Sequence, residues 1–219
     1  MPLKKRVLLV DDHPIYRMGL ALLLQKQKQF EVFIERSTPE SAWQTFQCEP
    51  FDLVICDIWV HSKTSFELVK NIRHQPSACP ILVLSIQEEE FWARRALKVG
   101  ANGYLMKNDP IADVLRAVDT VMAGDIYLNQ RVQQQILRDI SGQTAEAIPL
   151  NLLTEREVEV FQHLIHGMDS DSIGKALFIS LKTVQTHQAN IRRKLDVASL
   201  TELRQLAYRY RNSGIPQVN

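Results

Sequence analysis

Up to about Asp125, short apolar runs alternate with longer segments in which apolar residues recur at helical spacing. The runs are Val7–Val10, Val32–Ile34, Leu53–Cys56, Ile81–Leu84 and Tyr104–Met106. Each is too short for a helix and is bounded by turn-forming or charged residues, as buried strands are. Because strands that alternate with helices pair in parallel, this part of the chain predicts an α/β fold. We expect a doubly wound five-stranded parallel sheet with helices on both faces.

Several helix boundaries are marked by residues with strong terminal preferences. Thr38-Pro39 combines an N-cap residue with proline at the first helical position. The segment from Phe91 to Val99 ends at Gly100, which suits the position after a helix. A helical repeat before Gly124 is formed by Ile111, Val114, Leu115, Val118 and Met122.

Beyond residue 151 the pattern is helical throughout. Residues 141–151, SGQTAEAIPLN, are small, polar and proline-bearing, which is typical of a linker. Four helices are expected after it, with the N-caps Thr154, Asp169, Ser180 and Ser199 and the inward residues Val158, Phe161, Ile165, Ile173, Leu177, Val184, Ile191 and Leu195. The sequence therefore predicts one domain over 1–125, a helix and linker over 126–150, and a small all-α domain over 151–219.

Polar residues follow the predicted strands at the point where each ends. Asp11 and Asp12 follow the first strand, Asp57 the third and Lys107 the fifth, while Ser85 ends the fourth. Ligands of open parallel sheets bind at this carboxyl-end edge, so these side chains converge there. Three crowded carboxylates repel one another, and a hard divalent cation relieves that repulsion.

Oxygen-only ligands with room for water favour Mg²⁺ over zinc at this edge. A carboxylate beside the ion can attack phosphorus, while the lysine and the ion neutralise the transferring phosphoryl group. The serine hydroxyl can hydrogen-bond the acyl phosphate. The alternative is that Asp12 caps the helix near Pro14 and that the other aspartates belong to ordinary turns. Joint placement of all five groups favours the metal site.

Composition names no partner by itself. The net charge is +1 and the pI is near 7.8. No apolar stretch approaches the roughly 18 residues of a membrane span, and the N-terminal apolar run ends too early, at Asp11, for a secretory signal. Three cysteines without CxxC spacing are consistent with reduced thiols in a cytoplasmic protein.

The strand-end residues, with Tyr104 three residues before Lys107, resemble the receiver domain of bacterial two-component response regulators. The opening VDDHPIYRMGL is similar to the NarL/FixJ subfamily. The segment LTEREVEVFQHLIHGMDSDSIGKALFISLKTVQTHQANIRRKLDV resembles the LuxR-type helix-turn-helix. The two resemblances cover nearly the whole chain.

The resemblance implies a role for each strand-end residue. A sensor histidine kinase would donate phosphate to Asp57, while Lys107 and Ser85 would serve the transfer. Mg²⁺ would be held by Asp11, Asp12, Asp57 and the backbone carbonyl of Trp59. Ser85 and Tyr104 would shift on phosphorylation.

The loop after Asp57 departs from the family pattern. His61 stands where a proline is common and Ser65 where a glycine is common, and Asn108 replaces the proline that often follows the lysine. No chemical group of the site is lost, but the loop is expected to have an unusual shape. His61 itself is read as a solvated loop histidine, because no second His or Cys joins it.

The third C-terminal helix has an apolar stripe and a polar face. The face carries the expected DNA-binding residues Lys182, Thr183, Gln185, Thr186, Ala189, Asn190, Arg192 and Arg193. Glutamine and asparagine can pair with adenine, and lysine and arginine contact phosphate. Residues 148–212 hold nine Lys/Arg and seven Asp/Glu, a balance of +2. So small a balance predicts weak binding by one domain and a need for dimerisation.

The predicted function is a cytoplasmic two-component response regulator rather than an enzyme. Phosphorylated on Asp57, it would bind double-stranded DNA as a homodimer and regulate transcription. One alternative keeps the regulator but makes it independent of phosphorylation, on the ground of the altered 61–65 loop. The other is a phosphatase or phosphotransferase of the haloacid-dehalogenase type, whose nucleophile lies in a DxDxT pattern on the first strand; DDHPI does not match it.

Overall fold

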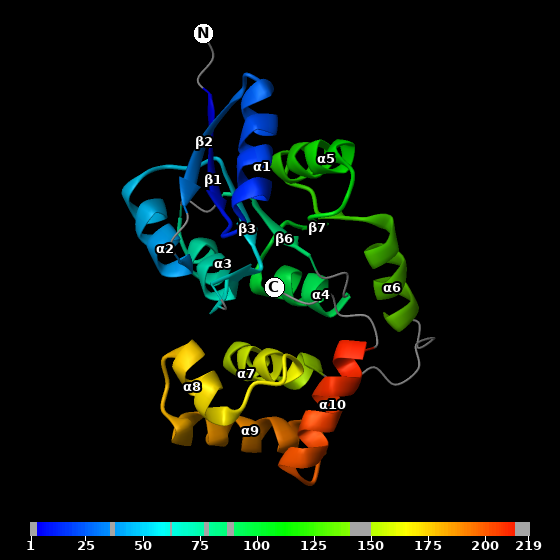
Figure 1. The fold of residues 1–219 in the computed structure, drawn as a ribbon. Helices are drawn as coiled ribbons and strands as arrows, with labels where there is room; N and C mark the ends of the chain where they lie inside the picture. The colour runs from blue at the N-terminus through cyan, green and yellow to red at the C-terminus, as the bar shows by residue number, and fades with distance from the viewer. Residues whose placement is uncertain are drawn as a thin grey trace. The chain divides into compact units, whose positions relative to one another are not determined.

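A computed structural model describes residues 4–35, 38–61, 63–76, 79–86, 90–140 and 150–212 (Figure 1). The chain divides into two compact units, residues 1–137 and residues 138–219. Within the described residues, no helix is both long and apolar enough to cross a bilayer.

A parallel sheet forms the centre of the first unit. Its strands are β1 (Lys5–Val10), β2 (Phe30–Glu35), β3 (Leu53–Asp57), β6 (Ile81–Ser85), β7 (Gly103–Met106) and β8 (Tyr127–Leu128). They run in the order β2-β1-β3-β6-β7-β8, and all pairs are parallel. The five predicted strands are confirmed. The sixth, β8, was not expected, because two residues carry no periodic signal.

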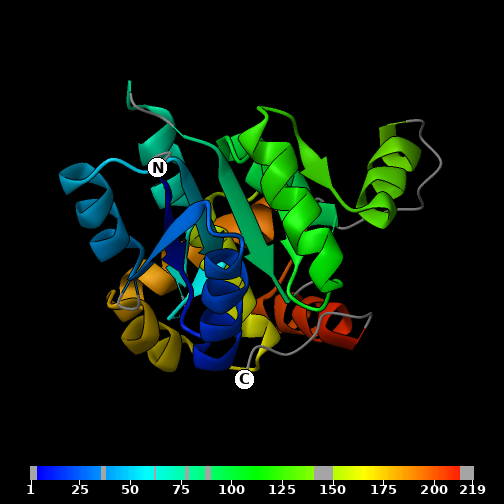
Figure 2. The same ribbon diagram turned by 90° about the horizontal axis from the view of Figure 1, so that it is seen from above.

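Helices cover both faces of this sheet, as predicted (Figures 1 and 2). They are α1 (Pro14–Lys26), α2 (Pro39–Cys48), α3 (Phe66–Arg73), α4 (Glu90–Val99) and α5 (Ile111–Met122), followed by α6 (Gln130–Ile140). One buried cluster joins α1 and α5 to the sheet, and it includes Leu24 of α1, Val118 of α5, and Val7 and Leu9 of β1. Helices α2, α3 and α4 contact one another in sequence. The carboxyl ends of the strands are left free to carry a site.

The predicted helix boundaries are confirmed in this unit. Thr38 caps α2 through a capping box with Ser41. Gly100 and Gly124 follow α4 and α5 with φ of 110° and 92°. At Gly100 a Cβ would also lie 2.5 Å from the Arg73 side chain, so only glycine fits there. All three cysteines are free, with Cys56 and Cys79 buried.

The second unit is helical in its described residues. Its helices are α7 (Glu155–Ile165), α8 (Ser170–Leu177), α9 (Leu181–Lys194) and α10 (Leu200–Asn212), after a 3₁₀ turn at Leu150–Leu152. A core lies between them, made of Val158, Phe161, Ile173, Val184, Ile191, Leu203 and Ala207. Most of the predicted linker, residues 141–149, lies outside the described residues, and its last two residues belong to the 3₁₀ turn.

All four predicted N-caps of this unit are confirmed. Thr154 forms a capping box with Glu157, and Asp169 and Ser180 accept the expected backbone N–H bonds. At α10 the Ser199 hydroxyl accepts from the Glu202 N–H at 3.1 Å. The Glu202 carboxylate accepts from the Ala198 N–H at 3.0 Å, one residue before the N-cap. The Lys194 ammonium binds Glu157 Oε2 at 2.7 Å and joins α9 to α7.

Candidate functional site

Lys107 holds two carboxylates together at the carboxyl-end edge of the sheet. Its Nζ lies 2.6 Å from Asp57 Oδ2 and 2.8 Å from Asp11 Oδ2. Asp11 follows β1, Asp57 ends β3 and Lys107 follows β7, so three elements bring the groups together. All three side chains are at most 5% exposed. The sequence-based expectation that these residues converge is therefore confirmed.

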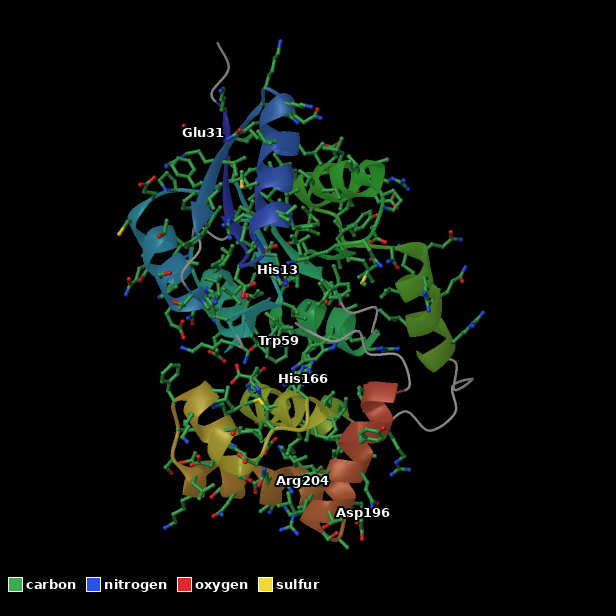
Figure 3. All side chains as sticks on the ribbon, viewed as in Figure 1. His13, Glu31, Trp59, His166, Asp196 and Arg204 are labelled. Atoms are coloured by element: carbon green, nitrogen blue, oxygen red, sulfur yellow. The ribbon has the colours of Figure 1, made fainter. Side chains whose placement is uncertain are left out.

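His13 lies at the centre of the same cluster and was not predicted. Its Nδ1 is 3.0 Å from Asp12 Oδ1, 3.3 Å from Asp11 Oδ1 and 3.3 Å from Asp57 Oδ2. Lys107 Nζ is 3.0 Å away from the same nitrogen. Figure 3 shows His13 at this edge of the first unit. The signal was available in the run DDH, because a residue that directly follows two strand-end aspartates stays close to them.

Burial and like charge shift the proton affinities of the cluster. Burial raises the pKa of Asp11, the charge of Asp57 raises it further, and Lys107 opposes both. The hydrogen bond with Asp57 raises the pKa of His13 against the effect of burial. Burial likewise raises the pKa of Tyr16, whose ring lies 5.1 Å from Lys107 Nζ. The site thus concentrates negative charge in a poorly solvated place.

The loop after Asp57 is a β-hairpin, with β4 (Trp59–Val60) antiparallel to β5 (Lys63–Thr64). His61, at its turn, has a φ of 48° and donates its backbone N–H to Asp12 Oδ2 at 2.7 Å. Its side chain is 58% exposed, as expected for a loop histidine. Ser65 donates its hydroxyl to the Asp57 backbone carbonyl. The two departures from the family pattern in this loop, His61 and Ser65, therefore both bond to aspartates of the site.

Trp59 and the two predicted switch residues, Ser85 and Tyr104, are buried near the carboxyl ends of β3, β6 and β7. The Trp59 backbone N–H donates to Asp57 Oδ1 at 3.3 Å, and the Trp59 ring packs edge-on against Trp92 of α4, with centroids 5.5 Å apart. Ser85 and Tyr104 are fully buried. The Ser85 carbonyl accepts from the Lys107 backbone N–H at 2.7 Å. Their roles in switching, and that of the Trp59 carbonyl as a ligand, stay predictions.

The chemistry of these donors fits a divalent cation. One donor atom each from Asp11, Asp12, His13 and Asp57 lies within 4.8 Å of the others. Three carboxylates with one lysine leave an excess of negative charge for a cation to balance. His13 Nδ1 also belongs to this group of candidate donor atoms, beside the oxygen donors expected from the sequence.

Helix α9 presents the predicted DNA-binding face. None of its eight residues is buried, whereas Val184, Gln188 and Ile191 on the opposite side are. The Gln188 amide bonds the Ser170 hydroxyl at 3.0 Å and ties α9 to α8. Arg192 donates to the Ala198 carbonyl at 3.2 Å, so it also supports the turn after α9. The predicted face is thus available to a ligand, while its contacts with DNA stay a prediction.

The acidic residues near this face are engaged within the protein. Asp169 caps α8, and Asp171 pairs with Lys175 at 2.6 Å. His187 is half-buried, and burial lowers its pKa, which agrees with a packing role.

A sheet edge of the receiver type in the first unit and a helix-turn-helix-like second unit together define the class of protein as a response regulator. The family of response regulator receiver domains matches residues 7–119, and the luxR family of bacterial regulatory proteins matches residues 151–207. The chain belongs to the NarL/FixJ response regulators, two-component transcription regulators with a receiver and a LuxR-type DNA-binding domain.

Similar proteins share this organisation over nearly their full length. The Fimbriae Z protein of Salmonella typhimurium is 34% identical over 199 residues, which cover 90% of this chain and 93% of that one. The transcriptional regulatory protein LiaR of Bacillus subtilis is 33% identical over 205 residues, 93% of this chain and 97% of that one. The response regulator RcsB of Salmonella typhimurium has the same fold, with a TM-score of 0.68 at 22% identity, covering 94% of this chain and 97% of that one.

Proposed function

We propose that Asp57 accepts a phosphoryl group from a sensor histidine kinase and that the phosphorylated protein controls transcription. The observation that carries this proposal is the ion triad of Lys107, Asp57 and Asp11 at the sheet edge. A buried ammonium 2.6 Å from the carboxylate is placed to neutralise charge that arrives on that carboxylate.

In the proposed reaction, a carboxylate oxygen of Asp57 attacks the phosphorus of a phosphohistidine. The new O–P bond forms as the P–N bond breaks, and its electron pair stays on the imidazole nitrogen, which takes up a proton. Lys107 stabilises the negative oxygens during transfer. Mg²⁺, held by Asp11, Asp12, Asp57 and the Trp59 carbonyl, would supply further positive charge when bound.

The test is phosphorylation of the purified protein by acetyl phosphate. Wild type should gain one phosphoryl mass, labile to hydroxylamine, only when a divalent cation is present. Asp57→Ala should gain none, whereas Asp125→Ala, a change at an exposed aspartate after α5, should behave as wild type. Phosphorylation of Asp57→Ala at the wild-type level would show that the assignment is wrong.

The DNA-binding part of the proposal is carried by the exposed face of α9. A helix fits the major groove, and two such helices about one DNA turn apart would read a pseudo-palindromic site as a homodimer. We assign residues 1–125 to the receiver, 126–150 to the helix and linker, and 151–219 to the DNA-binding domain. Such a regulator would act in the cytoplasm, where its DNA lies.

Phosphorylation has two possible routes to DNA binding. Ser85 would move toward the phosphoryl group and Tyr104 would repack, which changes the surface of α4 and α5. The surface expected to change runs from Glu88 to Val99 and from Ile111 to Ala123, and its residues 88 and 89 lie outside the described residues. The changed surface would either release a docked DNA-binding domain or pair two receivers.

Deletion of residues 1–140 separates the two routes, since the second unit has a core of its own. Under release, the fragment should bind DNA better than the unphosphorylated full chain. If the fragment binds worse than both forms of the full chain, receiver pairing is the main route.

Phosphorylation-independent regulation is the second candidate, favoured by the unusual hairpin at His61. It predicts that Asp57→Ala binds DNA as tightly as wild type treated with acetyl phosphate. A large difference between the two would exclude it.

A further inference from the structure

Neither helix capping nor core packing explains the position of the His13 side chain. It is the N-cap residue of α1, yet its side chain makes no capping hydrogen bond. Its backbone N–H donates to Asp11 Oδ1 at 2.7 Å, which closes a tight turn and holds the imidazole beside the carboxylates. The side chain remains 38% exposed, so it is not needed to fill the core.

The donor spacing around the imidazole nitrogen matches a coordination sphere. Octahedral metal–ligand bonds of about 2.1 Å place neighbouring donor atoms about 3.0 Å apart. His13 Nδ1 lies 3.0, 3.3 and 3.3 Å from one oxygen each of Asp12, Asp11 and Asp57. Three carboxylates around one nitrogen at this spacing are what a shared cation would require.

We propose that His13 Nδ1 is a direct ligand of the cation at this site, which gives the receiver a preference for transition-metal dications such as Mn²⁺ over Mg²⁺. Imidazole is a good ligand for transition metals and a poor one for Mg²⁺, which takes oxygen. This inference rests on the proposed function, in which the cluster binds a divalent cation.

Lys107 does not block this role. Its ammonium lies 3.0 Å from His13 Nδ1, and one nitrogen lone pair cannot serve both the ammonium and a metal. The ammonium also lies 2.6 Å from Asp57 Oδ2 and 2.8 Å from Asp11 Oδ2. Hydrogen bonds to these carboxylates are stronger than one to a neutral imidazole, so Lys107 remains well bound when a metal occupies the nitrogen.

Pulsed electron paramagnetic resonance of the full-length protein with Mn²⁺ tests the inference. A coordinated imidazole gives ¹⁴N modulation of the echo, which should change to the ¹⁵N pattern when histidine is ¹⁵N-labelled. His13→Phe keeps the ring but removes the donor, so the modulation should vanish. His61→Asn is the matched control, because it removes the other imidazole near the cluster, whose Nδ1 lies 3.6 Å from Asp12 Oδ2. Asparagine also tolerates the left-handed backbone at this position. The ¹⁴N modulation should persist in this variant.

Affinities give the second readout. Free Mn²⁺, measured by its resonance signal, gives the Mn²⁺ Kd, and displacement by Mg²⁺ gives the Mg²⁺ Kd in the same titration. In His13→Phe the Mn²⁺ Kd should rise about tenfold or more, while the Mg²⁺ Kd changes less than about threefold. If His13→Phe does not fold, ¹⁵N-histidine labelling of His61→Asn decides, because His13 is the one histidine of the donor cluster in the described part of the chain and the nearby His61 is then absent.

The outcomes separate the two proposals. Mn²⁺ bound to wild type without nitrogen coupling, or coupling that survives in His13→Phe, overturns the role of His13 and leaves phosphoacceptance by Asp57 intact. Absence of any Mn²⁺ or Mg²⁺ binding to wild type overturns both.

Discussion

Removal of the Lys107 ammonium should destabilise the receiver in a way that a divalent cation reverses. In Lys107→Met the stem is kept, but Asp11 and Asp57 are left as neighbouring buried carboxylates without their shared partner. Lys107 also opposes the rise in the pKa of Asp11, so the variant should hold a proton there to higher pH.

The expected magnitude follows from the two distances. At 2.6 and 2.8 Å each pair has a gross attraction of roughly 6 kcal/mol at an effective dielectric constant of about 20. Desolvation of the ammonium offsets much of this, and breaking a buried pair on one side costs about 3–5 kcal/mol. We therefore expect the free energy of unfolding to fall by about 3–5 kcal/mol without added metal.

Urea unfolding followed by tryptophan fluorescence measures this change, because Trp43, Trp59 and Trp92 all lie in the first unit. Mg²⁺ at about a hundred times its Kd adds about 2.7 kcal/mol to a protein that binds it only when folded. Mg²⁺ should bind the variant more tightly, since no ammonium competes. At a fixed Mg²⁺ concentration it should therefore stabilise Lys107→Met more than wild type.

The double variant Lys107→Met, Asp57→Asn should recover part of the loss, because one uncompensated charge is gone. A loss below about 1 kcal/mol, or equal stabilisation by Mg²⁺ in both proteins, would refute the reasoning.

Three further outcomes are expected. Mg²⁺ or beryllofluoride should change the tryptophan fluorescence, and Trp59→Phe should remove most of that change; a signal unaltered in this variant would contradict the hairpin geometry. Arg193→Ala should weaken binding to every DNA sequence and lower the salt slope by about one. Gln185→Ala should relax base preference by about 1–3 kcal/mol, and uniform weakening by both variants would mean that α9 does not read bases. Burial lowers the pKa of His163 to about 4, so stability should fall by up to roughly 3 kcal/mol as pH drops from about 6.5 to 4, where the unfolded chain takes the proton first. Hydrogen exchange in α7 should show this loss in wild type and much less of it in His163→Leu.

Much of the fold was predictable because its signals are local and repeated. The apolar runs of β1, β3 and β6 are buried throughout their predicted cores, and the caps at Thr38 and Thr154 start helices as expected. Strand β8 and the β4–β5 hairpin have two-residue strands, so no periodicity could show them.

The part of the site that depends only on the order and direction of the strands was predictable from the sequence. Asp11, Asp57 and Lys107 meet because parallel strands end at one edge, and the sequence shows where each strand ends. The run DDH places His13 near the aspartates, but the direction of its imidazole depends on a turn that the sequence does not show. The contact of His61 with Asp12 depends on a positive φ, which the sequence does not show either. Arg192, expected only to face DNA, also bonds Ala198, a contact that depends on the turn after α9.

The left-handed turn at His61 limits how this loop can be re-engineered. Proline requires a φ near −65° and has no N–H, whereas His61 has a φ of 48° and uses its N–H to hold Asp12. Replacing His61 alone by the proline common in the family would therefore break the hairpin rather than restore the usual loop. Ser65 donates its hydroxyl to the backbone carbonyl of Asp57, so His61 and Ser65 each fix this loop to an aspartate of the site. We therefore expect a change at His61 alone to disrupt the loop, whereas an exchange of the whole segment 59–65 would replace the turn together with its contacts.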